Sequence, residues 1–359
     1  MRPISAREPN FLISAAAILL AALAIIALAS PPAIEAKEKT AKMLFGGKAL
    51  PADLPARSIG FYSKGCLAGG VAIPVDGPHW QVMRLSRNRR WAHPELVKLL
   101  DRLSSRAARD GWNGLLIGDM SQPRGGPMLT GHLSHQIGLD ADIWFTPMPD
   151  ERLTYRQREE MSAYSVLAPG SLYVDDSRWS KAHENLLRDA AGFSQVQRIL
   201  VHPGVKKKLC DTVKGDRSWL AKIRPYYGHD YHFHIRIRCQ DGSPDCQAQN
   251  AVGTDIGCDK SLNWWFNTAL KPKTGKPPAK KREIVMSDLP ATCRGVLEAE
   301  DMPNDEAEMQ FAMPGFSAPE VEIPKFSYAA ALASKPIESE IPAPGVQGKI
   351  PIPTPRPAR

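Results

Sequence analysis

The chain lacks several patterns that would assign it to common classes of protein. None of its six cysteines forms a Cys-x-x-Cys pair, which argues against a zinc-finger type of site. No internal repeat is visible, so solenoid and propeller folds are not indicated. A nucleic-acid-binding motif is also missing, although the formal net charge is +8. The function therefore has to be inferred from local clusters of residues.

A long apolar run near the N-terminus predicts export. Phe11 to Ala29 is almost unbroken in its apolar character, and it follows the basic residues Arg2 and Arg7. Small residues come directly after it. We expect residues 1–36 to be a signal peptide that is cleaved, after which no stable membrane insertion is expected. A retained membrane anchor is the alternative, because the run is long for a signal.

Export changes the interpretation of the cysteines. An even number of cysteines in an oxidising compartment favours three disulfides, and six cysteines allow 15 pairings. Cys239 and Cys246 are the simplest local pair, because they bracket a turn-forming Gln-Asp-Gly-Ser-Pro-Asp segment. The residues alone select no other pairing.

The positive charge is unevenly distributed. Residues 301–359 carry eight acidic and five basic side chains, so the rest of the chain carries about +11. Such a balance suits an acidic polymer. A cell-wall polymer with free carboxylates matches the exported compartment, whereas nucleic acid does not.

Composition divides the chain into four parts. Residues 37–57 are expected to be a flexible lead-in, and residues 58–300 a globular catalytic domain. Within it, residues 271–282 hold six basic side chains in twelve positions and predict a solvated loop. Residues 301–359 contain 11 prolines in 59 positions and are expected to be a disordered tail.

Hydrophobic periodicity predicts an α+β fold. We expect a central, mainly antiparallel sheet, flanked by helices and cross-linked by disulfides. Apolar residues at helical spacing predict helices, and short apolar or alternating runs predict strands. The expected helices span 91–103 and 179–191, and the expected strands span 115–117, 140–145, 196–201 and 232–239.

Five of the nine histidines fall in two short segments, 131–145 and 228–238. On a strand, side chains alternate between faces, so His232, His234, Arg236 and Arg238 share one face. Asp140, Asp142 and Trp144 share a face in the same way. If the two strands are neighbours, a metal ion can bind between them and keep one position for water. Its ligands would be His135, Asp142 and His234.

Each of these residues has a plainer interpretation when taken alone. His-x-His pairs also occur on solvated strand faces, and an Asp near a turn is often a helix cap. The remaining histidines are expected to be ordinary surface or core residues: His79, His93, His183 and His202. Only the combination of the two segments indicates a metal site.

The segment Ser134-His-x-x-Gly-x-Asp-x-Asp142, followed by His232-x-His234, resembles the zinc peptidases that include lysostaphin-type enzymes and D-Ala-D-Ala dipeptidases. Further motifs narrow the resemblance to the penicillin-insensitive murein endopeptidase family of the Gram-negative periplasm, over residues 58–266. These motifs lie at residues 65–69, 80–91, 118–120, 123–132 and 224–227.

The resemblance implies zinc as the cofactor and a role for each histidine of the two segments. It implies His135, Asp142 and His234 as ligands, sometimes with His132, and His232 and His229 as catalytic-site residues. It also implies the disulfides Cys66–Cys293, Cys210–Cys258 and Cys239–Cys246. A second zinc site known in some members is not expected, because residues 168–176 contain no His.

The implied substrate is peptidoglycan, cut at its D-alanyl–meso-diaminopimelyl cross-links in the periplasm. His232 would act as a base or as a partner of the oxyanion, and these roles stay open. Arg124, Arg236 and Arg238 are candidates for binding substrate carboxylates, with ordinary surface charge as the alternative. Two other functions remain: a D,D-carboxypeptidase or dipeptidase, and a non-catalytic zinc-bearing module that binds the cell wall.

Overall fold

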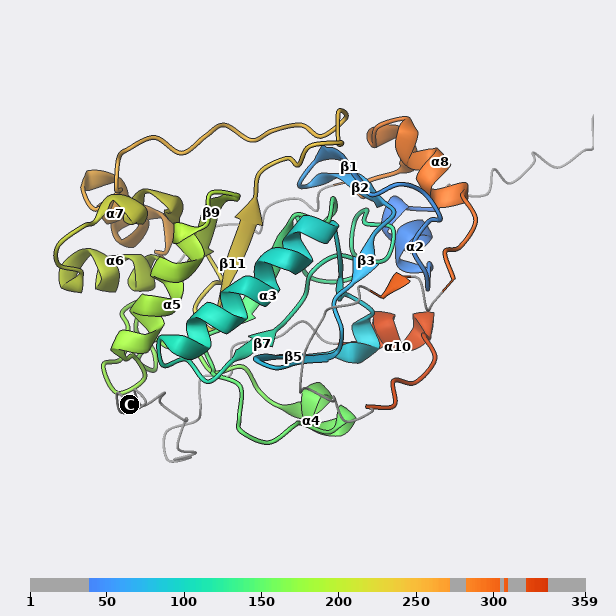
Figure 1. Cartoon of the computed structure of the whole chain (residues 1–359). Coiled ribbons are helices and arrows are strands. Elements are labelled where there is room, and N and C mark those ends of the chain that lie inside the picture. Colours follow the sequence, from blue (N-terminus) through green and yellow to red (C-terminus); the bar gives the residue numbers. More distant parts are fainter. Residues whose placement is uncertain (1–38, 272–281, 304–306, 309–320, 335–359) are drawn as a thin grey trace, which may run out of the picture. The chain divides into compact units, whose positions relative to one another are not determined.

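The structure is a computed structural model that describes residues 39–271, 282–303, 307–308 and 321–334. The expected signal peptide, nearly all of the basic loop and most of the tail lie outside these residues. Among the described residues, no helix is long and apolar enough to span a membrane. The fold is α+β, as predicted (Figure 1).

A seven-stranded sheet forms the centre of the fold. Its strand order is β10-β9-β11-β8-β7-β5-β4. Four of the six neighbouring pairs are antiparallel, and the pairs β10–β9 and β5–β7 are parallel, so the sheet is mixed. Its strands are β4 (Asp76–Gly77), β5 (Trp80–Val82), β7 (Leu115–Ile117), β8 (Asp140–Trp144), β9 (Val196–Val201), β10 (Ile223–Pro225) and β11 (His232–Ile237).

Two short two-stranded antiparallel sheets accompany it. They are β1 (Arg57–Phe61) with β2 (Lys64–Ala68), and β3 (Val71–Ala72) with β6 (Trp91–Ala92). The helices are α2 (Ala41–Gly46), α3 (Pro94–Arg109), α4 (Tyr155–Glu160), α5 (Lys181–Gly192), α6 (Pro203–Thr212), α7 (Lys260–Trp264), α8 (Thr292–Glu298) and α10 (Tyr328–Ala333). The short turns of other helix types are η1 (Leu85–Arg87), η2 (Ser218–Lys222), η3 (Trp265–Ala269) and η4 (Met286–Asp288).

The main core lies between one face of the sheet and the helices α3 and α5 (Figure 1). Phe233, Ile235 and Ile237 of β11 point into this core, as do Ala141 and Ile143 of β8. The alternation predicted for both strands is therefore present. The polar residues between them necessarily occupy the opposite face, which is the face that carries the site.

Element boundaries differ from the predicted ones by a few residues. Residues 91–92 form β6, and α3 starts at Pro94 because the ring nitrogen of His93 accepts the Glu95 N–H and caps the helix. Strand β11 ends at Ile237, so Arg238 lies beyond it and is exposed. Arg238 therefore does not share the face of His232 and His234.

The described part of the predicted lead-in, residues 39–57, is folded where a flexible segment was expected. It contains α2, whose Phe45 and Ala41 are fully buried. Both belong to a second apolar cluster, with residues from β1, β2 and α8. The physical reason is that Phe45 finds apolar partners that are distant in sequence, which no local pattern could indicate. Of the tail, Ala307 and Ala331 are also buried, so its described parts pack against the domain.

Three disulfides cross-link the structure, and they are the pairs that the resemblance implies: Cys66–Cys293, Cys210–Cys258 and Cys239–Cys246. Cys66–Cys293 joins β2 to α8 inside the second apolar cluster. It closes a sequence separation of 227 residues, whereas Cys239–Cys246 closes one of 7.

We expect the long-range disulfide to stabilise the fold more than the local one. Loop-closure entropy gives about 5 kcal/mol for the longer loop and about 2 kcal/mol for the shorter one. The double variant Cys66→Ser/Cys293→Ser should therefore lose more unfolding free energy in urea than Cys239→Ser/Cys246→Ser. Equal losses would contradict this ranking.

Candidate metal and catalytic site

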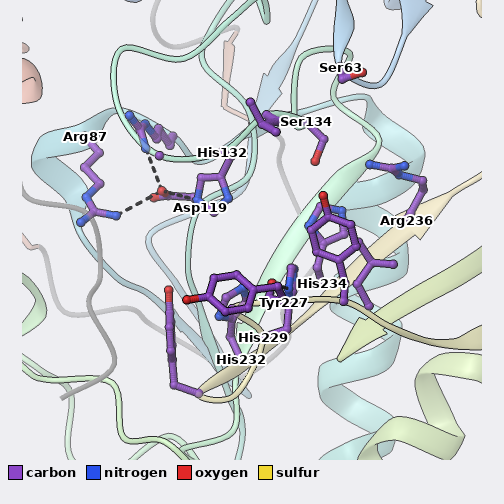
Figure 2. Close-up of a pocket in the computed structure, with 17 residues that line it drawn as sticks. Ser63, Arg87, Asp119, His132, Ser134, Tyr227, His229, His232, His234 and Arg236 are labelled. Carbon is purple, nitrogen blue, oxygen red and sulfur yellow. Dashed lines mark hydrogen bonds and ion pairs between the residues drawn. The ribbon is translucent and has the colours of Figure 1, made fainter. Parts of the chain in front are cut away.

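The polar face of the sheet forms the floor of a cavity of about 650 Å³. Histidines from both predicted segments line it, together with Asp119, Arg236 and the two tyrosines at 226 and 227 (Figure 2). Leu133 and Tyr227 at the cavity are 74% and 72% exposed, so the wall carries apolar groups that face solvent. The cavity therefore offers both a polar floor and apolar contacts to a ligand.

Asp142 lies at the centre of the histidine cluster. Its Oδ1 is 3.4 Å from His135 Nε2, 3.2 Å from His234 Nδ1 and 3.6 Å from His232 Nε2. Its Oδ2 is 3.4 Å from His132 Nε2. Strand pairing produces this arrangement, because Asp142 on β8 is directly opposite His234 on β11.

The buried donor atoms of this cluster fit a metal ion. His135 is fully buried, yet neither of its ring nitrogens has a hydrogen-bond partner among the described residues, and Asp142 Oδ1 has none there either. Unpaired buried polar atoms are costly unless something else binds them. Ligand atoms of His132, His135 and Asp142 lie within 4.8 Å of one another. Imidazole with carboxylate is a donor set that suits zinc.

A left-handed turn carries His135 into the cluster. His135 has a φ of 67°, which a residue with a side chain rarely adopts, and Gly138 has a φ of 72°. A Cβ atom at Gly138 would lie 2.8 Å from the backbone nitrogen of His93. The Gly of the His-x-x-Gly motif therefore permits the close approach that lets the chain turn from His135 into β8.

The environments of His135 and Asp142 favour the protonation states that metal ligands need. Burial lowers the pKa of His135, which keeps its imidazole neutral. Burial would raise the pKa of Asp142, but the neighbouring His135 and His232 outweigh it and hold the pKa well below its usual range. The carboxylate is therefore ionised and the imidazole has a free lone pair, as metal binding requires.

His234 is oriented by Asp140. Its Nε2 lies 3.0 Å from Asp140 Oδ1, so Nε2–H donates to this carboxylate and Nδ1 is left facing Asp142. Burial lowers the pKa of His234, but Asp140 and Asp142 outweigh this effect and raise it. The sequence analysis gave Asp140 no role, although its place in the Asp-x-Asp motif was a signal.

Asp119 holds the ring of His132. Its Nε2 lies 3.0 Å from Asp119 Oδ2. The same carboxylate oxygen accepts hydrogen bonds from Arg87 Nη1 at 3.1 Å and Arg89 Nη1 at 2.8 Å (Figure 2). Arg89 also donates to the Thr130 carbonyl, just before His132 in the chain. This pair of arginines was missed by the sequence analysis.

His232 and His229 face the cavity beside Asp142 and its neighbouring histidines. Their rings are 4.9 Å apart, centroid to centroid. Burial lowers the pKa of His232 to about 4, and in the part of the chain that the structure describes its Nδ1 has no hydrogen-bond partner. His229 Nδ1–H donates to the Tyr227 carbonyl at 2.8 Å, which leaves its Nε2 as an acceptor. Both imidazoles can therefore take part in hydrogen bonding or proton transfer with a bound ligand.

The structure does not support Arg124 as a substrate-binding residue. Arg124 is fully buried, and it does not line the cavity. Its Nη1 donates to the carbonyls of Val296, Leu297 and Ala299 at the end of α8, and its Nη2 pairs with Asp301 at 2.6 Å. The guanidinium therefore anchors the C-terminal part of the domain.

Arg236 lines the cavity, but its guanidinium is already paired. Its Nε and Nη2 donate to the two oxygens of Asp140 at 2.7 and 3.2 Å, and its Nη1 donates to Gln249 at 2.9 Å. This pairing favours a structural contribution over the binding of a substrate carboxylate.

Three of the histidines that were expected to be ordinary surface or core residues have structural contacts. His93 and His202 cap α3 and α6, and His183 is buried and lies 3.1 Å from the Phe145 carbonyl.

Comparison with known proteins gives one consistent family. Residues 58–298 match the family model described as penicillin-insensitive murein endopeptidase. A protein of this name from Klebsiella pneumoniae is 38% identical over 281 residues, covering 78% of this chain and 97% of the relative. Another from Haemophilus influenzae is 39% identical over 254 residues, covering 69% and 84%. The match extends beyond residue 266 and includes α8 and Cys293.

We expect Arg124 to contribute to stability and not to substrate affinity. Arg124→Leu leaves several buried carbonyls without a donor, so the free energy of unfolding should fall by about 3–5 kcal/mol. Urea unfolding measures this loss, and steady-state kinetics of the folded fraction should show an unchanged KM. The exposed Arg238→Leu serves as the control. A raised KM with unchanged stability would restore Arg124 as a binding residue.

Proposed function

We propose that this chain, which belongs to the penicillin-insensitive murein endopeptidase family, is a zinc-dependent peptidase that hydrolyses the D-alanyl–meso-diaminopimelyl cross-links of peptidoglycan. The observation that carries the proposal is the buried cluster around Asp142 at the floor of the cavity. Family membership supports murein as the substrate. The expected signal and the three disulfides support the periplasm as the compartment.

His135, Asp142 and His234 would hold the metal, with His132 as a further candidate ligand. A zinc ion supplies Lewis-acid chemistry to an amide carbonyl when it is bound. His132 differs from the other three residues because its side chain is 24% exposed and Asp119 already occupies its Nε2. We therefore assign it to the edge of the metal site.

His232 would move the proton during hydrolysis. Water adds across the peptide C–N bond, so the carbonyl carbon gains a hydroxyl group and the leaving amine gains a proton. His232 faces the cavity beside the cluster, and an imidazole in this position can accept a proton from water and pass it to the amine. His229, next to it, would orient His232 or the leaving group.

The cavity wall would bind the peptide stems. Leu133, Tyr226 and Tyr227 present exposed apolar surface at the cavity. Tyr227 and Tyr226 also carry hydroxyl groups, which suits a substrate that combines aliphatic and polar parts. A peptide held there would place its scissile bond over the polar floor.

Metal removal tests the activity directly. Treatment with EDTA should abolish conversion of purified dimeric muropeptides to monomers, and added Zn²⁺ should restore it. Liquid chromatography with mass spectrometry measures the products. Release of terminal D-Ala with the cross-links intact would favour the carboxypeptidase alternative. Binding to sacculi without any cleavage would favour the non-catalytic module.

Substitutions should separate the metal ligands from the proton-transfer residue. His135→Ala and Asp142→Ala should lose bound zinc and with it the cleavage activity. His232→Ala should keep about one zinc per chain and lose about 100- to 10,000-fold in rate. Metal analysis and initial rates on dimeric muropeptides measure both effects. His93→Asn is the matched control, because Asn can still cap α3. A His232→Ala protein that cleaves at the parental rate would remove His232 from the mechanism.

A further inference from the structure

Asp140 is a buried carboxylate that contacts two of the proposed metal ligands. It is fully buried, and it lies two residues before Asp142 on β8. Its Oδ2 accepts the backbone N–H of His135 at 3.0 Å. Its Oδ1 accepts Nε2–H of His234 at 3.0 Å. One side chain therefore links the loop ligand to the strand ligand.

The contact with His135 supports an unfavourable backbone conformation. A left-handed conformation is unfavourable for a residue with a Cβ atom, and His135 adopts it with a φ of 67°. A hydrogen bond from its backbone N–H to a carboxylate is strong, because the acceptor is charged. Asp140 therefore offsets the cost of the turn that brings the His135 ring within 3.4 Å of Asp142.

The hydrogen bond between Asp140 and His234 determines which ring nitrogen of His234 carries the lone pair that faces Asp142. Because Nε2–H donates to Asp140, the lone pair of the neutral ring is on Nδ1. Nδ1 is the atom that lies 3.2 Å from Asp142 Oδ1. Without Asp140, the ring could carry its proton on either nitrogen and rotate, so fewer molecules would present the lone pair to the metal.

Arg236 holds Asp140 in the position from which it contacts both His135 and His234. The two residues are direct cross-strand partners, and the guanidinium binds both carboxylate oxygens in a fork. The guanidinium also stacks over the ring of Tyr62, with its Cζ 4.1 Å from the ring centroid. The Tyr62 hydroxyl in turn donates to the Ile237 carbonyl at 2.8 Å. Arg236 therefore holds both oxygens of the carboxylate that contacts His135 and His234.

We propose that Asp140 and Arg236 are positioning residues that hold His135 and His234 in the metal-binding geometry before the metal binds. This inference rests on the proposed metal site and extends it. It also gives Arg236 a role other than the capture of substrate carboxylates. A partner that orients a metal ligand typically contributes about 10- to 100-fold to metal affinity.

The test compares metal binding in the full chain and in two variants that each remove a buried carboxylate. In Asp140→Asn, Zn²⁺ affinity, measured by competition with a chromophoric chelator, should fall about 10- to 100-fold. The absorption spectrum of the Co²⁺-loaded protein should also change, because the ligand field changes with the position of His234. Circular dichroism verifies that the variants are folded.

Asp76→Asn is the matched control. Asp76 is also a buried carboxylate held by a buried arginine, since Arg158 Nη2 lies 2.8 and 3.0 Å from its two oxygens. It belongs to β4 at the far edge of the sheet, away from β8 and β11. Its substitution should lower stability but leave Zn²⁺ affinity and the Co²⁺ spectrum unchanged.

Arg236→Lys keeps the positive charge but loses the fork, so it tests the same idea if Asp140→Asn fails to fold. It should weaken Zn²⁺ binding less than Asp140→Asn does. The proposal is overturned if the folded variants at 140 or 236 bind Zn²⁺ as tightly as the parent with the same Co²⁺ spectrum. It is also overturned if Asp76→Asn loses as much affinity as Asp140→Asn. A parent protein that binds no Zn²⁺ would instead refute the metal site of the proposed function.

Discussion

Backbone hydrogen bonds between β8 and β11 set Asp142 opposite His234 and Asp140 opposite Arg236. The strand residues of the site take their places from this register, and the left-handed turn brings His135 to them. Because side chains alternate along a strand, a shift of one residue would turn the two aspartates of β8 into the apolar core. The aliphatic residues of both strands, packed under α3 and α5, resist that shift. The core therefore specifies the position of the proposed metal ligands on both strands.

Burial makes the charges of the site depend on one another. Asp119, Asp140 and Asp142 are all buried, and a buried carboxylate is costly unless it is paired and hydrogen-bonded. Asp119 has two arginines and His132, and Asp140 has Arg236 and His234. Asp142, by contrast, forms its ion pairs with imidazoles. A bound cation would neutralise the charge of this carboxylate.

The structural support of the site extends to α2, which was predicted to lie outside the domain, and to α8 near the end of the domain. Phe45 of α2 packs in the second apolar cluster with the Cys66–Cys293 disulfide. Arg124, in the loop just before His132, holds the end of α8. The segments at the two ends of the domain therefore brace the loop that carries His132 and His135. Their contacts span more than a hundred residues, so no local periodicity could reveal them.

The sequence by itself determined which residues could act. Alternation along 232–237 separated the histidines from the core, and the spacing of His135 and Asp142 indicated a metal site. Only the tertiary structure decided how they act together. It placed Asp140 between His135 and His234, paired Arg236 with it, and buried Arg124 outside the cavity lining. The reason is physical: periodicity fixes the face on which a side chain lies, whereas its partners and its burial depend on contacts between segments distant in sequence.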